Sequence, residues 1–153
     1  MTPDNKLEPK ATAEQKPKSL ARFLSAIARI LMGLGFFIFG LNGFLQFIPQ
    51  PKTPMPEGAV AFAGALMKTG YMFPLIAGTQ LLVGVLLLVN RFVPLALVLI
   101  MPVLVNIIAF HIFLAPSASA MAPGAILMAL ELYLAWAYRD YYRPMLVARA
   151  KPG

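Results

Sequence analysis

Residues 92–114 read FVPLALVLIMPVLVNIIAFHIFL, a stretch that is apolar throughout apart from two prolines, Asn106 and His111. A helix needs about 17–25 mainly apolar residues to cross the hydrocarbon core of a bilayer. The stretch therefore predicts a membrane-spanning helix. A polar side chain at membrane depth is costly, so Asn106 and His111 should face other helices or a cavity rather than lipid.

Three more apolar stretches of similar character, residues 30–48, 73–89 and 124–138, occur in the same chain. The 153-residue sequence is 59% hydrophobic, and its mean hydropathy of +0.75 is far above that of soluble domains. Since a soluble bundle would show a single apolar stripe on each helix, these segments, apolar nearly all round, predict an all-α membrane fold. We expect a transmembrane four-helix bundle.

The segment between the first two predicted spans adds a further element. Four prolines between Pro49 and Pro56 exclude a regular helix there, whereas EGAVAFAGALMKT, residues 57–69, places apolar residues at helical spacing. We expect a short extra helix at the outer membrane interface, ended by Gly70. An alanine-rich loop is the alternative.

The two ends of the chain are polar and basic. Residues 1–19 are rich in Lys, Pro and Glu and have little to bury, so they predict a disordered tail, and the helical pattern starts at Leu20. The transmembrane domain then covers residues 20–146, and residues 147–153 form a short basic tail. Because the first apolar run is longer than a signal-peptide core and no small-residue cleavage site follows it, we interpret it as an uncleaved signal anchor.

Lys and Arg are distributed unevenly about the predicted spans. Eleven of the 13 lie on the N-terminal side, in the C-terminal tail or at Arg91, whereas only Lys52 and Lys68 lie on the opposite side. Cytoplasmic segments carry the excess of basic residues, so both termini are predicted to be cytoplasmic. Trp136, Tyr138 and the tyrosines that follow them agree, since such residues gather at membrane interfaces.

The predicted spans contain six polar or ionisable side chains: Asn42, Gln46, Gln80, Asn106, His111 and Glu131. At about 1.5 Å of rise per residue, all six fall in the middle or the outer half of their spans. Side chains that only pack helices together would have no reason to share one side of the membrane. We therefore predict one outward-opening polar pocket that binds a ligand or relays protons.

Glu131 is the strongest candidate within this set. An acidic side chain near the middle of a membrane is costly when ionised and alone, so it should be protonated, hydrogen-bonded or paired. Gln80 at similar depth and His111, about 6 Å farther out by helix rise, are its candidate partners. Asn106 and His111 point about 140° apart on a regular helix, so both face inward only if Pro102 distorts the span. The alternative is a hydrogen-bond network that only holds the helices together.

Composition excludes or disfavours several function classes. The chain has no cysteine, which excludes a catalytic thiolate, disulfide exchange and iron–sulfur ligation by its own residues. One His and one Glu within the spans are too few strong ligands for a zinc or iron site, so no metal site is predicted. The basic residues collect at helix ends, where topology and anionic lipid headgroups require them, and do not indicate nucleic-acid binding. We identify no catalytic residue.

Three stretches carry a family resemblance: ARILMGLGFFIFGLNGF in the first span, FPLIAGTQLLVGVLLLVNRFVPLALVLIMP across the second and third, and VNIIAFHIF within the third. With the outer Gly/Pro-rich segment, they make residues 29–144 resemble the DoxX/DoxD family of small four-span membrane proteins. Many members of this family carry a lysine just after the first-span glycine and a glutamate at the position of Gln80. This chain has Leu41-Asn42-Gly43 and Gln80 instead, so it lacks that charged pair.

The resemblance implies association with membrane redox systems, since some members are described as subunits of thiosulfate:quinone oxidoreductases or as scaffolds for oxidative-stress enzymes. It implies a bacterial inner-membrane protein that binds a small or quinone-like ligand as a subunit of a redox complex, without autonomous activity. No intrinsic cofactor is expected, and quinone is the candidate ligand. The expected partners are the lipid bilayer, a redox enzyme subunit and a second copy of the chain. A proton-coupled carrier centred on Glu131 and a non-catalytic scaffold are the alternatives.

Overall fold

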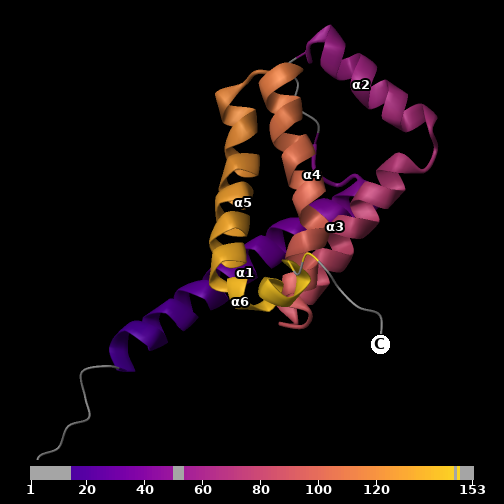
Figure 1. The fold of residues 1–153 in the computed structure, drawn as a ribbon. Helices are drawn as coiled ribbons and strands as arrows, with labels where there is room; N and C mark the ends of the chain where they lie inside the picture. Colours follow the sequence, from indigo (N-terminus) through magenta and orange to yellow (C-terminus); the bar gives the residue numbers. More distant parts are fainter. Residues whose placement is uncertain (1–14, 50–53, 147, 149–153) are drawn as a thin grey trace, which may run out of the picture.

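The computed structural model describes residues 15–49, 54–146 and 148, and over these residues every regular element is a helix (Figure 1). The long helices are α1 (Gln15–Leu45), α3 (Met72–Leu88), α4 (Val93–Phe113) and α5 (Ala118–Ala137). The shorter elements are α2 (Glu57–Lys68), α6 (Arg139–Tyr142) and a 3-10 turn (Arg143–Leu146). The all-α class predicted from the sequence is confirmed.

Three of the helices are long and apolar enough to cross a membrane by themselves: α1 over Leu20–Leu45, α4 and α5. The 17-residue α3 follows α2 after a sharp bend of 89°, and the two count as a fourth candidate if they form one broken span. The chain therefore has three to four candidate membrane spans, which is the pattern of a multi-pass membrane protein.

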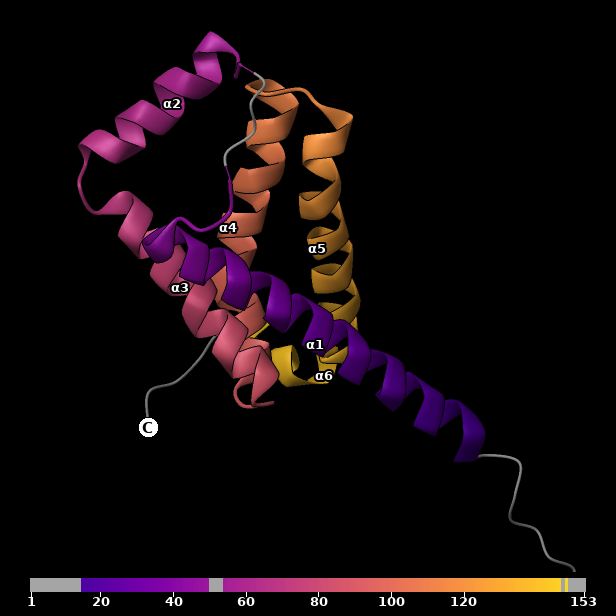
Figure 2. The same ribbon diagram turned by 180° about the vertical axis from the view of Figure 1, so that it is seen from behind.

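The long helices cross in two pairs. α4 and α5 stand side by side and run in opposite directions, while α1 and α3 pack on each other and cross the first pair at an angle (Figures 1 and 2). The start of α1, the α3–α4 turn and α6 lie at one end of the molecule, which we call the α6 end. The end of α1, α2 and the α4–α5 connection lie at the other, the α2 end.

The contact between α1 and α3 is built on glycines. A Cβ at Gly40 would lie 2.5 Å from a backbone nitrogen of α3, and a Cβ at Gly84 would lie 2.5 Å from a backbone nitrogen of α1. Gly43 extends the contact, because its Cβ would lie 2.5 Å from the Cβ of Ala77. Backbone thus rests on backbone, which is the packing that small residues permit between membrane helices.

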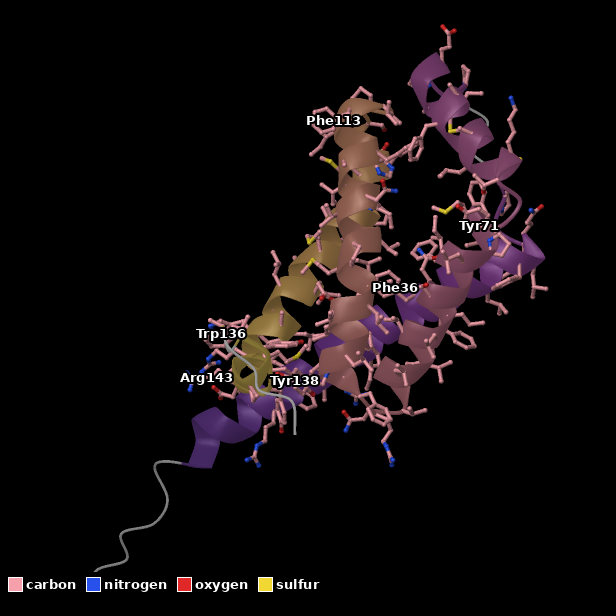
Figure 3. All side chains as sticks on the ribbon, turned by 45° about the vertical axis from the view of Figure 1, so that its right-hand side comes forward. Phe36, Tyr71, Phe113, Trp136, Tyr138 and Arg143 are labelled. Atoms are coloured by element: carbon pink, nitrogen blue, oxygen red, sulfur yellow. The ribbon has the colours of Figure 1, made fainter. Side chains whose placement is uncertain are left out.

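An apolar core fills the region where the four long helices meet, and Phe36 is labelled within it in Figure 3. Its fully buried side chains come from all four helices: Met32, Phe36, Val83, Leu87, Leu97, Ile100, Leu104 and Leu134. The outer faces carry large apolar side chains as well, such as Val105 at 52% and Ile126 at 61% exposure. A surface with so much exposed apolar area is suited to lipid rather than water.

The short extra helix expected after the proline-rich segment is present as α2. It starts directly after Pro56 and ends at Lys68, and Gly70 adopts the left-handed backbone with φ of +75°. The predicted helix and its end at Gly70 are therefore confirmed. α2 leans away from the other helices (Figure 1) and reaches α4 through Phe62, whose ring centroid lies 5.9 Å from that of Phe110.

The turn between α3 and α4 is short, with four residues between the two helices. Asn90 and Phe92 both adopt left-handed backbone, with φ of 55° and 52°, and reverse the chain within four residues. Arg29 of α1 stabilises this end of α3, because its guanidinium donates to the carbonyl oxygens of Leu87 and Leu88. A cation at a helix C-terminus also interacts favourably with the helix dipole.

α1 begins earlier than the sequence pattern predicts. Its first residue is Gln15 rather than Leu20, so residues 15–19 are helical and not a disordered tail. Pro17 lies in the first turn, where its missing N–H has no helical partner to lose. The disorder predicted for residues 1–14 lies outside the described residues, as does most of the predicted tail at residues 147–153.

α5 also begins earlier, at Ala118 rather than at residue 124. Ser117 caps it, since the serine side-chain oxygen accepts a hydrogen bond from the backbone N of Ala120 at 3.4 Å. Such caps favour helix initiation, and the alanines that follow are the strongest helix formers. Pro123 removes one hydrogen bond in the second turn without ending the helix. Residues 118–123, which precede the predicted span at 124–138, are therefore helical.

The glycine contact predicts a sharp difference between two substitutions on α3. Gly84→Ala should lower the free energy of unfolding by about 1–3 kcal/mol, because overpacking forces the backbones of α1 and α3 apart. Gly78→Ala should be neutral or slightly stabilising, since nothing lies within 4 Å of its Cβ position. Unfolding in mixed micelles with increasing dodecyl sulfate measures the free energy of unfolding of both variants. Equal losses from the two variants would show that α1 and α3 do not pack through these glycines.

Candidate functional site

Four helices enclose a cavity of about 420 Å³ towards the α2 end, which we call the α2-end cavity. Its lining is mainly apolar and includes the rings of Phe36, Phe39 and Phe73, while three polar residues from three helices also line it: Asn42, Gln80 and His111. Ligand pockets typically have volumes of about 300–1,000 Å³ and combine an apolar lining with a few polar groups. The cavity is suited to a small, flat molecule with one or two polar atoms.

Asn42 is positioned by the end of α1. The helix stops at Leu45, and the Asn42 Oδ1 accepts a hydrogen bond from the backbone N of Ile48 at 2.7 Å. Because this oxygen is engaged, the amide NH₂ group is the donor that Asn42 can offer to a ligand. Gln46 follows the helix end with φ of +50°; it is exposed and does not line the cavity.

His111 and Gln80 line the same cavity from α4 and α3. The Nδ1 of His111 lies 2.8 Å from the carbonyl oxygen of Ile107. A carbonyl only accepts, so Nδ1 carries a proton, and in the neutral ring Nε2 remains as an acceptor. Gln80 is half-buried and offers an amide donor and an acceptor. The cavity therefore provides both kinds of hydrogen-bonding group.

Asn106 does not join these residues. It is exposed on α4 and is not part of the cavity lining. α4 continues as one helix through Pro102, and of these two residues only His111 lines the cavity. Their spacing of five residues leaves His111 inside and Asn106 outside, and the expectation that both face one pocket is corrected.

Glu131 lies apart from the other predicted site residues. It is 1% exposed and borders a separate cavity of about 250 Å³, whose lining on α4 includes Val98 and Pro102. Glu131 does not line the α2-end cavity, and it lies one turn, about 6 Å along α5, beyond Leu127, the last residue of this helix that does. The single pocket expected for the six polar residues is therefore divided, with Glu131 closer to the α6 end.

The surroundings of Glu131 leave oxygen atoms without donors. Its Oε2 is buried and has no hydrogen-bond partner among the described residues. Pro102 has no N–H, so the carbonyl oxygen of Val98, four residues earlier, lacks its usual helical donor. Buried polar atoms are costly unless they are hydrogen-bonded, so the Oε2 of Glu131 is an unfavourable group in the core of the described residues.

Tyr142 closes the same cavity from the α6 end. Its hydroxyl donates a hydrogen bond to the carbonyl oxygen of Pro94 at 3.3 Å, which ties α6 to the first turn of α4. Burial, with smaller contributions from the nearby Glu131 carboxyl and Tyr138 hydroxyl, raises the pKa of Tyr142 to about 12. The hydroxyl therefore remains a donor at neutral pH.

A third hollow, the α6-end pocket, was not anticipated as a site. It has a volume of about 580 Å³, and its lining includes Arg22, Arg29 and Arg139. Sequence reasoning gave these arginines a topological role, because residues of α1 and of the α5–α6 junction are far apart in the chain. The one available signal was the close succession of aromatic and basic residues from Trp136 onward.

Metal ligation finds no support in this arrangement. Within residues 15–49, 54–146 and 148, no three His, Asp or Glu side chains gather as a group that could hold a metal ion. The residues that could hold an organic cofactor or ligand are those of the α2-end cavity. Comparison with known proteins found no match, whether to a protein-family model, a curated protein or a solved structure.

The hydroxyl of Tyr142 predicts a specific alkaline loss of stability. Between about pH 10 and pH 12 the unfolded chain releases this proton while the folded chain retains it, so the free energy of unfolding falls as pH rises. Tyr142→Phe should lack this alkaline fall in the free energy of unfolding. At neutral pH its free energy of unfolding should be lower by about 0.5–1.5 kcal/mol, because the hydrogen bond of the hydroxyl is lost. Unfolding measured on both sides of pH 10 tests this. Tyr141→Phe, exposed on the same short helix, is the control and should keep the wild-type profile.

Proposed function

We propose that the chain is an integral membrane protein that binds a small quinone-like molecule in the α2-end cavity and serves as a non-catalytic subunit of a membrane redox system. In this proposal α1, α3, α4 and α5 form a transmembrane four-helix bundle, and α2 lies along the outer interface. The resemblance of residues 29–144 to the DoxX/DoxD family supports the proposal.

The observation that carries the ligand proposal is the chemistry of the α2-end cavity. A quinone head is a flat ring with two carbonyl oxygens, and amide groups such as those of Asn42 and Gln80 supply the donors that these oxygens accept from. The hydroxyl groups of the reduced form are donors, for which the Nε2 of His111 is the matching acceptor. Phenylalanine rings line the rest of the cavity and suit an aromatic head, because aromatic rings attract each other beyond the area that they bury.

The two positions where the chain departs from the charged pair of the resembling proteins both involve this cavity. Gln80, at the position where a glutamate is common in that family, lines it, and so does Asn42 of the Leu41-Asn42-Gly43 segment, which has no lysine. A neutral cavity accommodates an uncharged ring without placing an ion pair in a medium of low polarity, where the desolvation of charges is costly. This difference favours ligand binding over chemistry that depends on charge.

The proposed placement in a bacterial inner membrane, with both termini in the cytoplasm, is supported by charge. Arg22, Arg29, Arg91, Arg139 and Arg143 all belong to the α6 end, whereas Lys68 lies at the α2 end. Basic residues concentrate on the cytoplasmic side of membrane proteins. The α2-end cavity would then lie in the outer half of the membrane.

Direct titration of a short-chain ubiquinone or menaquinone into the purified protein tests the ligand. Gln80→Leu should raise the dissociation constant about two- to tenfold, the effect of losing one neutral hydrogen bond. Asn106→Leu is the matched control: it also removes an amide from a membrane helix, but outside the cavity, and should bind as the wild type does. Absence of quinone binding by folded wild-type protein, or equal losses in the two variants, would contradict the proposal.

A proton-coupled carrier is a second candidate, favoured by the buried carboxyl of Glu131, whose Oε2 has no hydrogen-bond partner among the described residues. In a carrier, Glu131→Gln should abolish pH-driven uptake by reconstituted vesicles, while Glu57→Gln, which changes an exposed carboxyl on α2, should leave it intact. Uptake that survives Glu131→Gln would exclude this candidate.

The same residue separates a carrier from a scaffold without transport activity. If Glu131 is kept for function, Glu131→Met should maintain the free energy of unfolding or raise it by up to about 3 kcal/mol, because it removes an unsatisfied buried group. If Glu131 instead locks the helices through hydrogen bonds, the substitution should destabilise the fold. Unfolding of the two proteins in mixed micelles distinguishes these outcomes.

A further inference from the structure

The α6-end pocket is the largest of the three hollows described above, at about 580 Å³. It lies between the first half of α1 and the junction of α5 with α6, and Asn90 of the α3–α4 turn completes it. Trp136 and Tyr138 are labelled at this end of the molecule in Figure 3. The quinone-like ligand proposed above is not involved in this region.

The pocket is rich in hydrogen-bond donors. Arg22, Arg29 and Arg139 line it, and among the described residues no Asp or Glu does. Of the nearby acids that the structure describes, Asp140 pairs with Arg143 at 3.4 Å, and Glu131 borders the separate cavity between α4 and α5. Three guanidinium groups without a carboxylate make the site selective for an anion.

Two of the three arginines, Arg29 and Arg139, are held in place and keep donors free. Arg29 uses part of its guanidinium on the end of α3, and Arg139 lies 4.6 Å above the Trp136 ring while donating to the Trp136 carbonyl oxygen at 3.0 Å. A guanidinium has five N–H donors, so each of these two retains several for a ligand. Restricted arginines lose less freedom when they bind a phosphate in a forked geometry.

The surroundings of the pocket indicate that a bound anion would belong to a lipid headgroup. Trp136 and Tyr141 are exposed at its rim, by 64% and 67%, as is typical of residues at the level of lipid headgroups. The part of α1 that carries Arg22 also exposes Leu20, Phe23 and Leu24, by 58%, 62% and 47%. A ligand bound at the arginines would therefore lie beside an apolar surface that suits acyl chains.

We propose that the α6-end pocket binds the phosphate of an anionic phospholipid, with the guanidinium groups on the phosphate oxygens and the acyl chains along the exposed face of α1. Ser25 and Tyr133, whose hydroxyl oxygens lie 3.3 Å apart, supply further hydrogen-bonding groups for a headgroup that carries hydroxyls. The inference rests on the proposed membrane location and is independent of the proposed quinone-like ligand.

Native mass spectrometry of the full chain, purified and delipidated in detergent, tests the site. Equal amounts of phosphatidylglycerol and phosphatidylcholine are added, and one phosphatidylglycerol should be retained preferentially. Arg22→Gln combined with Arg139→Gln should reduce that preference about tenfold, since charge-assisted hydrogen bonds are roughly twice as strong as neutral ones. Arg29 is left unchanged because it also stabilises the end of α3.

The control removes the same charge from the same end of the molecule. Arg91→Gln combined with Arg143→Gln changes two arginines outside the pocket lining and should leave most of the preference intact. Equal losses in the two double variants, or no preference in the folded wild type, would overturn the inference. An excess of inorganic phosphate provides the last arm: if phosphate alone displaces the lipid and protects the protein against unfolding equally well, the site takes a free anion and the lipid assignment is wrong.

Discussion

The close approach of α1 and α3 is the constraint on which the rest of the structure depends. At Gly40 and Gly84 one helix backbone lies against the other with no room for a single methyl group. In lipid, helices gain little from burying apolar area, so such close packing supplies much of the attraction between them. The direction of α1 across α4 and α5 (Figure 2) follows from this contact, because α1 must stay against α3 along the whole length of their glycine contact.

This contact also determines what the α2-end cavity contains. Gly43 of α1 packs against Ala77 of α3 at the edge of this contact. The polar residues near it on the two helices, Asn42 and Gln80, are thereby brought together in the lining of the cavity. Two amides that are far apart in the chain thus reach the same space without contributing to the core. His111 arrives from α4, held by its own helix through the Ile107 carbonyl oxygen. The proposed ligand site is therefore a consequence of helix packing and lies beside the close backbone contact between α1 and α3.

The apolar stretches predicted the four long helices well, and the proline-rich segment with Gly70 predicted α2, because length, apolar composition and a left-handed glycine act locally. The site was harder to predict. The depth of Glu131 depended on where α5 begins, which a serine cap and a run of alanines moved by six residues. The side of the bundle that Asn106 faces depended on whether Pro102 bends α4, and a proline within a helix does not determine that by itself. The convergence of Arg22, Arg29 and Arg139 could not be predicted, since it arises only when the α1–α3 contact brings the start of α1 to the end of α5.

The position of Trp136 has a consequence for how this protein can be observed. It is the only tryptophan in the chain, it is 64% exposed, and a guanidinium lies over its ring. Along α5 it is about 14 Å from Leu127, the nearest residue of this helix in the lining of the α2-end cavity. The intrinsic emission of the protein is therefore a local signal: it responds to the polarity and charge at the α6 end, and contact quenching by a molecule bound in the α2-end cavity is out of reach. A single indole can thus report on the α6 end alone, without a cysteine label.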